Sequence, residues 1–464
     1  MRTPRAILTA LAVLVVLAVG FYVYAFHSAI DPLPTPPTNF DAQQVKRGEV
    51  LAAIGNCSTC HTIPGGKAFA GGREIPTPFG AIYATNITPD VETGIGRWSE
   101  AAFRRAMRQG VDRQGNHLYP AFPYDHFTLV TDEDNKAIYA YLMTRAPAHN
   151  TAPANALSFP FNIRLAVAGW KLLHFREGPF QPDLNHSAQW NRGAYLAEGL
   201  AHCSACHTPR NALGAEDKGK AYSGALVEGW WAYAIDKSAP APVAWTEDAL
   251  FQFLRRGWHE AHGLARGPMS PVVENLSAVP EEDVRAIANY VASIAGPPTP
   301  EQRQKGEALI AQERRPTTAS PTADVLAVPS TDSGNGPGRT IYASACATCH
   351  ESGRPLPYGG LPLGLSTALN GPNAYNIINV ILFGLPPAPG EGSPMMPAFH
   401  GSLTNAQIAD LLRYLRRRFT DKPAWGDLEK DIADARSGRR KPTLYPSPGS
   451  QAAPADPTQQ GEIW

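Results

Sequence analysis

The sequence predicts a mostly α-helical chain in which one kind of domain occurs three times behind an N-terminal transmembrane helix. Three observations support this prediction. An apolar run of bilayer length lies near the N-terminus, one five-residue motif occurs three times, and similar helical segments flank each copy. A chain of 464 residues is also too long for a single hydrophobic core.

The N-terminal element is an unbroken apolar run from Ala6 to Phe26, preceded by Arg2 and Arg5. It is long enough to span a bilayer as a helix, and its aromatic end is typical of a membrane–water interface. A cleaved signal peptide has a shorter apolar core and a small-x-small exit. We therefore favour an uncleaved anchor over residues 1–30, with a cleaved signal peptide as the alternative. The preceding positive charge places the rest of the chain outside the cytoplasm.

The repeated motif is Cys-x-x-Cys-His, and its three copies contain all six cysteines of the chain. This pattern is the attachment signature of haem c, in which two thiols bind the porphyrin and the histidine binds the iron. A zinc site needs two further ligands, and a redox dithiol has no use for the histidine. The sequence therefore predicts three haem c groups. Their thiols are Cys57, Cys60, Cys203, Cys206, Cys346 and Cys349, and their proximal ligands are His61, His207 and His350.

The flanking helices define the domains. A short helix that contains a glycine precedes each motif. Two helices follow it: the first ends in glycine, and the second, the final helix, contains a tyrosine. A glycine facing an aromatic residue lets the first and last helices cross closely, as in a class I cytochrome c domain. The expected domains span 41–146, 185–297 and 333–420. The glycines are Gly48, Gly193 and Gly338, and the tyrosines are Tyr141, Tyr290 and Tyr414.

The connecting segments differ in composition. Asp31 to Pro37 is predicted to be a polyproline stalk that holds the first domain off the membrane. Segment 147–184 is too apolar for a free linker, whereas 298–332 is rich in Pro, Thr, Ser and Ala and is predicted to be flexible. In the C-terminal tail, 421–464, one short charged helix over Leu428 to Arg436 precedes a disordered end.

Two methionines are candidates for the sixth iron ligand. Counting twelve residues from the helix-ending Gly257 and Gly384 reaches Met269 and Met396, which lie in proline-bounded loops. Thioether is a common sixth ligand in electron-transfer cytochromes. Met395 is the weaker choice because it breaks this register.

The first haem lacks such a methionine. The same count from Gly110 reaches Phe122, which cannot bind iron. Met107 on the preceding helix is the candidate substitute, with simple packing as an equal alternative, and His126 is a third possibility. Each proximal histidine should also donate to a backbone carbonyl, for which Pro64 and Pro209 are the candidates in the first two domains.

Lys+Arg and Asp+Glu are equal at 41 each, so nothing points to a nucleic-acid partner. No dinucleotide-binding loop or catalytic triad pattern is visible. The leading function is thus electron transfer without substrate chemistry. The alternative is a peroxidase-like haem enzyme that uses an open first haem, which only Phe122 favours.

The sequence resembles the membrane-anchored triheme cytochrome c subunits of bacterial periplasmic dehydrogenases. The residues that carry the resemblance are Asn86 to Asp90, His117 to Tyr124, Phe159 to Asn162 and Val272 to Asn275. The resemblance implies an inner-membrane protein whose domains face the periplasm. It also implies a catalytic partner, either a quinoprotein or a molybdenum hydroxylase acting on aldehydes or N-heterocycles, and ubiquinone or a terminal oxidase as acceptor.

Overall fold

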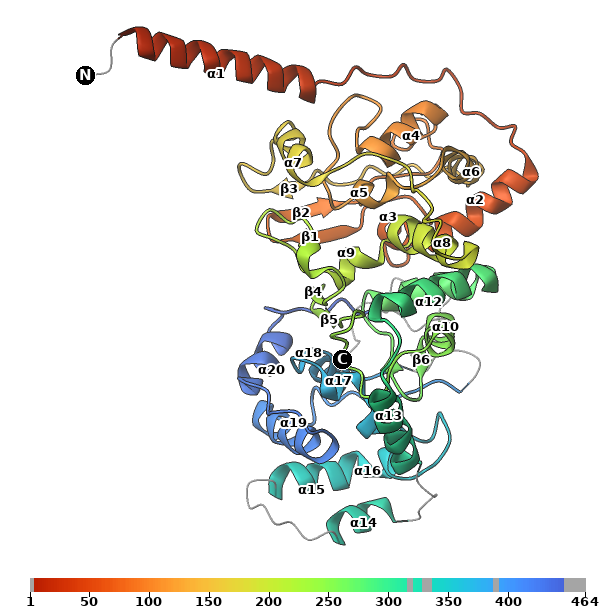
Figure 1. Ribbon diagram of the computed structural model, residues 1–464, viewed down its shortest axis with the longest axis vertical. Helices are drawn as coiled ribbons and strands as arrows, with labels where there is room; N and C mark the ends of the chain where they lie inside the picture. The colour runs from red at the N-terminus through yellow and green to blue at the C-terminus, as the bar shows by residue number, and fades with distance from the viewer. Residues whose placement is uncertain (1–3, 315–319, 328–335, 387–391, 446–464) are drawn as a thin grey trace. The chain divides into compact units, whose positions relative to one another are not determined.

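The computed structural model describes residues 4–314, 320–327, 336–386 and 392–445. It divides into two compact units: residues 1–182 with 198–202, and residues 183–197 with 203–464. Both units are mainly helical, and each contains short antiparallel strands (Figure 1).

The first unit contains the predicted membrane helix, four helices around the first motif, and one further helix. Its three-stranded sheet has the order β1-β2-β3, with Ile75 opposite Ile82 and Ala81 opposite Ala156. The helices are α1 (Pro4–Ala25), α2 (Ala42–Ile54), α3 (Cys57–His61), α4 (Glu100–Gln109), α5 (Tyr124–Phe127), α6 (Asp132–Met143) and α7 (Ala166–His174); the strands are β1 (Glu74–Thr77), β2 (Gly80–Tyr83) and β3 (Ala156–Leu157).

The second unit contains the other two motifs and two strand pairs, β4-β5 and β6-β7. Its elements begin with α8 (Ala188–Tyr195), which leads into the π-helix η1 (Leu196–Leu200), whose last three residues belong to the first unit. They continue with α9 (Cys203–His207), η2 (Lys218–Lys220), β4 (Ala225–Val227), β5 (Trp230–Ala232), α10 (Glu247–Arg256), β6 (Trp258–His259), β7 (Gly263–Leu264), α11 (Met269–Ser277) and α12 (Glu281–Ala295). They end with α13 (Pro300–Glu313), α14 (Pro321–Ala327), α15 (Gly336–Ala345), α16 (Ala347–His350), η4 (Leu363–Leu365), α17 (Thr367–Asn370), α18 (Tyr375–Phe383), α19 (Asn405–Phe419) and α20 (Leu428–Arg436).

The predicted close crossing of first and last helices is confirmed in all three repeats. A Cβ atom built on Gly48 of α2 would lie 1.9 Å from the Ala137 carbonyl oxygen of α6. On Gly193 of α8 it would lie 1.9 Å from the Ala286 oxygen, and on Gly338 of α15 it would lie 2.2 Å from the Asp410 oxygen. In each case the next residue that this atom would meet is the predicted tyrosine (Tyr141, Tyr290 or Tyr414), whose own Cβ would lie 2.8 to 2.9 Å away.

The middle helices end as predicted. Gly110, Gly257 and Gly384 follow α4, α10 and α18 with φ angles of 61°, 79° and 70°, a positive range that favours glycine. Thr131 caps α6 by accepting a hydrogen bond from the Asp134 N–H, and Thr404 forms a capping box with Gln407 at the start of α19.

The prediction of a flexible linker over 298–332 is wrong for its described residues. They form α13, which begins with a capping box between Thr299 and Gln302, and α14. Val325 of α14 is buried, and Thr322 donates to the Ala343 carbonyl oxygen at 2.8 Å. Residues 315–319 and 328–332 of this segment lie outside the described residues.

The other connecting segments also pack. In segment 147–184, β3 joins the sheet and α7 buries Val167 and Ala168 within the first unit. The short charged helix predicted at Leu428 to Arg436 is α20. The predicted disorder at the C-terminal end, and Arg2 before the anchor, concern residues outside the described ranges.

Candidate haem sites

The three motifs share a local structure. Cys57 to His61 and Cys203 to His207 each form one helical turn, and Cys346 directly precedes the turn that ends at His350. One turn of helix brings residues i and i+3 to the same side, so both thiols of each motif can reach one porphyrin edge. None of the six cysteines is in a disulfide. The donor set therefore suits covalent haem.

Each proximal histidine has a fixed orientation. The Nδ1 atoms of His61, His207 and His350 lie 2.6, 2.7 and 3.1 Å from the carbonyl oxygens of Thr85, Tyr233 and Leu361. A carbonyl only accepts, so Nδ1 carries the proton and Nε2 keeps the lone pair that binds iron. Burial lowers the pKa of all three imidazoles, which favours the neutral, ligating form.

These acceptors correct the sequence prediction. The carbonyls of Pro64 and Pro209 were expected, but the acceptors lie much farther along the chain, just after β2 and β5. A backbone carbonyl has no residue signature. No residue type therefore marks these acceptors in the sequence.

The loops after the first two motifs share a pattern of backbone hydrogen bonds. Gly71 and Gly224 each donate to the carbonyl oxygen of the preceding motif histidine at 2.7 Å. Ile87 donates to Phe69, and Ile235 donates to Tyr222, at 2.9 Å. In the third motif the corresponding loop is different, since Gly360 donates instead to the Cys349 carbonyl oxygen.

The two candidate methionines lie in ordered, half-buried positions. Met269 begins α11, and Met396 exchanges two backbone hydrogen bonds with Leu385, at 2.8 and 3.0 Å, just after α18. The neighbouring Met395 has 47% of its surface exposed. The pairing with Leu385 therefore fixes the register that distinguishes the two methionines.

Phe122 lies at the position that corresponds to Met269. Leu118 donates to the Gly110 carbonyl oxygen at 2.7 Å, and Ala265 donates to that of Gly257 at the same distance. Four residues later, Phe122 and Met269 each donate to the carbonyl three residues before them. The Phe122 ring packs against Phe127, with the ring centroids 5.3 Å apart.

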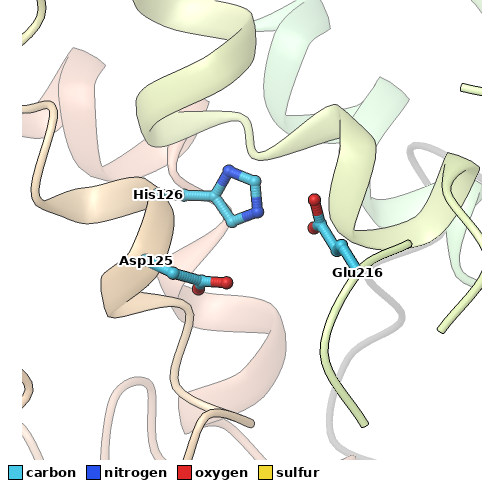
Figure 2. Close-up of side chains that lie close together, drawn as sticks. All are labelled: Asp125, His126 and Glu216. Atoms are coloured by element: carbon cyan, nitrogen blue, oxygen red, sulfur yellow. The ribbon is translucent and has the colours of Figure 1, made fainter. Parts of the chain in front are cut away.

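The substitute ligands considered for the first haem have other contacts. Met107 is buried on α4, and the corresponding Leu254 and Ile381 are buried to a similar extent. His126 lies beside Asp125 on α5 (Figure 2), and its Nδ1 donates to the Glu198 carbonyl oxygen at 2.8 Å. Glu216, also shown in Figure 2, belongs to the second unit, where it accepts a hydrogen bond from the Ser204 hydroxyl.

Comparison with known proteins agrees with this geometry. Residues 45–146 match the cytochrome c family model, and residues 335–415 match that of cbb3-type cytochrome c oxidase subunit III. The chain is 36% identical, over 84% of its length, to the fructose dehydrogenase cytochrome subunit of Gluconobacter japonicus, of which 83% is covered. The chain belongs to the family of dehydrogenase cytochrome c subunits.

Two further relatives extend the comparison. The gluconate 2-dehydrogenase cytochrome c subunit of Pantoea cypripedii is 35% identical, with 89% of it covered. A nicotinate dehydrogenase subunit of Pseudomonas putida is 46% identical over 87% of this chain, which spans only 33% of that relative. The resemblance found in the sequence is thereby confirmed, and so are the haem c cofactor and the role in electron transfer.

Proposed function

We propose that this cytochrome carries three haem c groups in three tandem class I domains, 41–146, 185–297 and 333–420. In this proposal it relays electrons from a partner dehydrogenase to ubiquinone or a terminal oxidase. The main support is that three motif histidines each donate Nδ1–H to a carbonyl and keep Nε2 for iron.

Different residues have different roles at each proposed haem site. The motif cysteines would hold the porphyrin, and His61, His207 and His350 would bind the iron. Met269 and Met396 would supply thioether ligands to the second and third irons, which would raise the potential and exclude small ligands. When bound, haem c supplies a reversible one-electron couple. Met107 is the candidate sixth ligand of the first iron, with packing alone as the alternative.

Helix α1 and the relatives support a proposed location and partner. Among the described residues, α1 is the one helix long and apolar enough to cross a membrane. We place it in the bacterial inner membrane, with the domains in the periplasm. The named relatives serve nicotinate, fructose and gluconate dehydrogenases. The 46% identity to the nicotinate enzyme favours a partner that oxidises an N-heterocycle, the molybdenum-hydroxylase type, over a quinoprotein.

The test uses the tagged full-length chain purified from membranes of its own host. A haem assay should give three haems per chain, and each Cys-to-Ser motif variant should lose one. The co-purified complex should reduce its haems on addition of one of nicotinate, fructose, gluconate or ethanol, and a short-chain ubiquinone should reoxidise them. A different haem count, or no reduction by substrate in a complex that retains its partner, would refute the proposal.

A second candidate function rests on Phe122 alone. A first haem with no sixth ligand would be open and could react with peroxide as an enzyme. Rapid carbon monoxide binding by one third of the reduced haem would favour this candidate. Absence of such binding would leave electron transfer as the only function of the first site.

A further inference from the structure

Helix α7 has a buried side and a separate exposed apolar side. Val167, Ala168 and Lys171 form its buried side within the first unit. Leu165, Leu172 and Leu173 remain 40, 48 and 67% exposed. Residues of a helix lie about 100° apart, so these three leucines fall within about 100° of one another, on the side away from Val167 and Lys171. Packing within the first unit therefore leaves these three leucines exposed.

The outer face of α7 continues onto the membrane helix. Gly169 belongs to this face, and a Cβ atom built on it would lie 3.9 Å from the ring of Phe21 in α1. Phe21 lies about 7.5 Å along the helix from Phe26, the aromatic end of the apolar run. The contact therefore occurs at the depth where a membrane helix leaves the hydrocarbon.

The end of α1 is fixed on the first unit by polar contacts. Lys171 Nζ lies 3.0 Å from His117 Nδ1, and His117 Nε2 lies 2.9 Å from the Ala25 carbonyl oxygen. Since a protonated lysine only donates, His117 accepts at Nδ1 and donates from Nε2 to the last residue of α1. Figure 1 shows the chain that leaves α1 running over the helices of this unit.

The segment after α1 is bound in the same way. Ile30 and Leu33 donate to the carbonyl oxygens of Arg113 and Arg97 at 2.9 Å. The prediction of a stalk at Asp31 to Pro37 is therefore wrong at its first residues. That stalk was expected to hold the domain off the membrane. The chain leaves the bilayer directly onto the domain, so α7 stays close to the membrane surface.

Side chains around α7 suit a lipid surface. The loop before it exposes Phe159, Phe161 and Ile163, at 79, 38 and 44%. Arg164 and Arg176 flank the helix and are exposed, and Glu177 is the acidic residue beside them. An apolar face with cationic flanks is typical of a helix that lies in the membrane interface.

We propose that α7 and the loop 159–163 form a second, interfacial membrane contact, occupied by anionic phospholipid. The leucine face enters the acyl boundary while the two arginines meet lipid phosphates. This contact goes beyond electron relay: it holds the first unit flat against the bilayer instead of leaving it on a tether.

The test uses the full-length, haem-loaded chain in nanodiscs of phosphatidylethanolamine and phosphatidylglycerol. A cysteine in place of Leu173 takes a spin label, since the native thiols are held by haem. The matched control is Glu133→Cys on the exposed surface of α6. Unchanged haem spectra show that both variants fold. Power saturation then compares access by oxygen, which concentrates in lipid, with access by a water-soluble nickel chelate.

The expected result is a several-fold higher oxygen-to-nickel accessibility ratio at position 173 than at position 133, together with the same direction of change for Phe159→Cys. Equal ratios at 173 and 133 would overturn the proposal, because they place α7 in water. A label at 173 that neither reagent reaches would also overturn it, since a protein partner would then cover this face.

Discussion

The glycine at each helix crossing gives the sharpest stability prediction, and Gly193→Ala tests it. The new methyl group would lie 1.9 Å from the Ala286 carbonyl oxygen and 2.8 Å from Tyr290 Cβ. Ordinary contact begins near 3.4 Å, and both neighbours are fixed to the helix backbone. The helices α8 and α12 must therefore separate by more than 1 Å, which also stretches the Arg192–Asp283 ion pair, now 2.8 Å long.

The cost follows from two opposing terms. Overpacking of this kind costs about 1–3 kcal/mol, and the upper end applies where nothing can rotate aside. The gain in helix propensity from Gly to Ala offsets about 1 kcal/mol. A net loss of about 2 kcal/mol lowers the melting temperature of a unit of this size by roughly 4–8 °C.

Thermal unfolding of the haem-loaded protein, followed by far-ultraviolet circular dichroism, measures this loss. Gly306→Ala is the matched control, because that helical glycine has its nearest neighbour at 3.5 Å. The control should melt at the wild-type temperature or slightly above it. Equal melting temperatures for the two variants would show that the crossing tolerates a methyl group and would refute the reasoning.

Three further predictions concern the haem sites and the membrane end. Phe122→Met should add a sulfur-to-iron charge-transfer band, because position 122 corresponds to Met269; Met269→Phe should remove one, and unchanged spectra would contradict the equivalence. Asn376→Ala should lower the stability of the second haem site by about 2 kcal/mol, because it removes two hydrogen bonds to the Trp231 backbone, at 2.8 and 2.9 Å; redox titration and urea unfolding measure the effect. Burial lowers the pKa of Lys171 from 10.5 to about 7. Between these pH values the folded chain therefore binds fewer protons than the unfolded chain. The free energy of unfolding should rise with pH in this range, by up to about 1.4 kcal/mol per pH unit. Lys171→Met should lose that rise in melting temperature.

The sequence predicted those features that depend on residue type at fixed spacing. The motif cysteines and histidines, the crossing glycines such as Gly193, and the helix-ending Gly110 all impose a local geometry that few other residues can adopt. Counting from these glycines also identified Phe122 as the residue that corresponds to Met269.

Other features depend on backbone atoms or on distant packing, and the sequence missed them. The acceptors for His61 and His207 are carbonyl groups of Thr85 and Tyr233, whose side chains are irrelevant to the bond. The helices in 298–332 were missed because their proline and threonine content is typical of a linker, yet Thr299 and Pro300 are also good helix-starting residues. The direct attachment of α1 to the domain depends on His117, which has no sequence signal for that role.

The pairing of β5 with α18 has a consequence for how the second and third sites influence each other. Asn376 of α18 binds both the N–H and the carbonyl of Trp231, and Tyr233 follows two residues later with the carbonyl that holds His207. In the proposed three-haem protein, any shift of α18 at the third site would therefore be passed through Asn376 and the Trp231 backbone to the carbonyl that holds His207. Coupling of this kind is reciprocal. The potential of each of these two proposed centres should then depend on the redox state of the other.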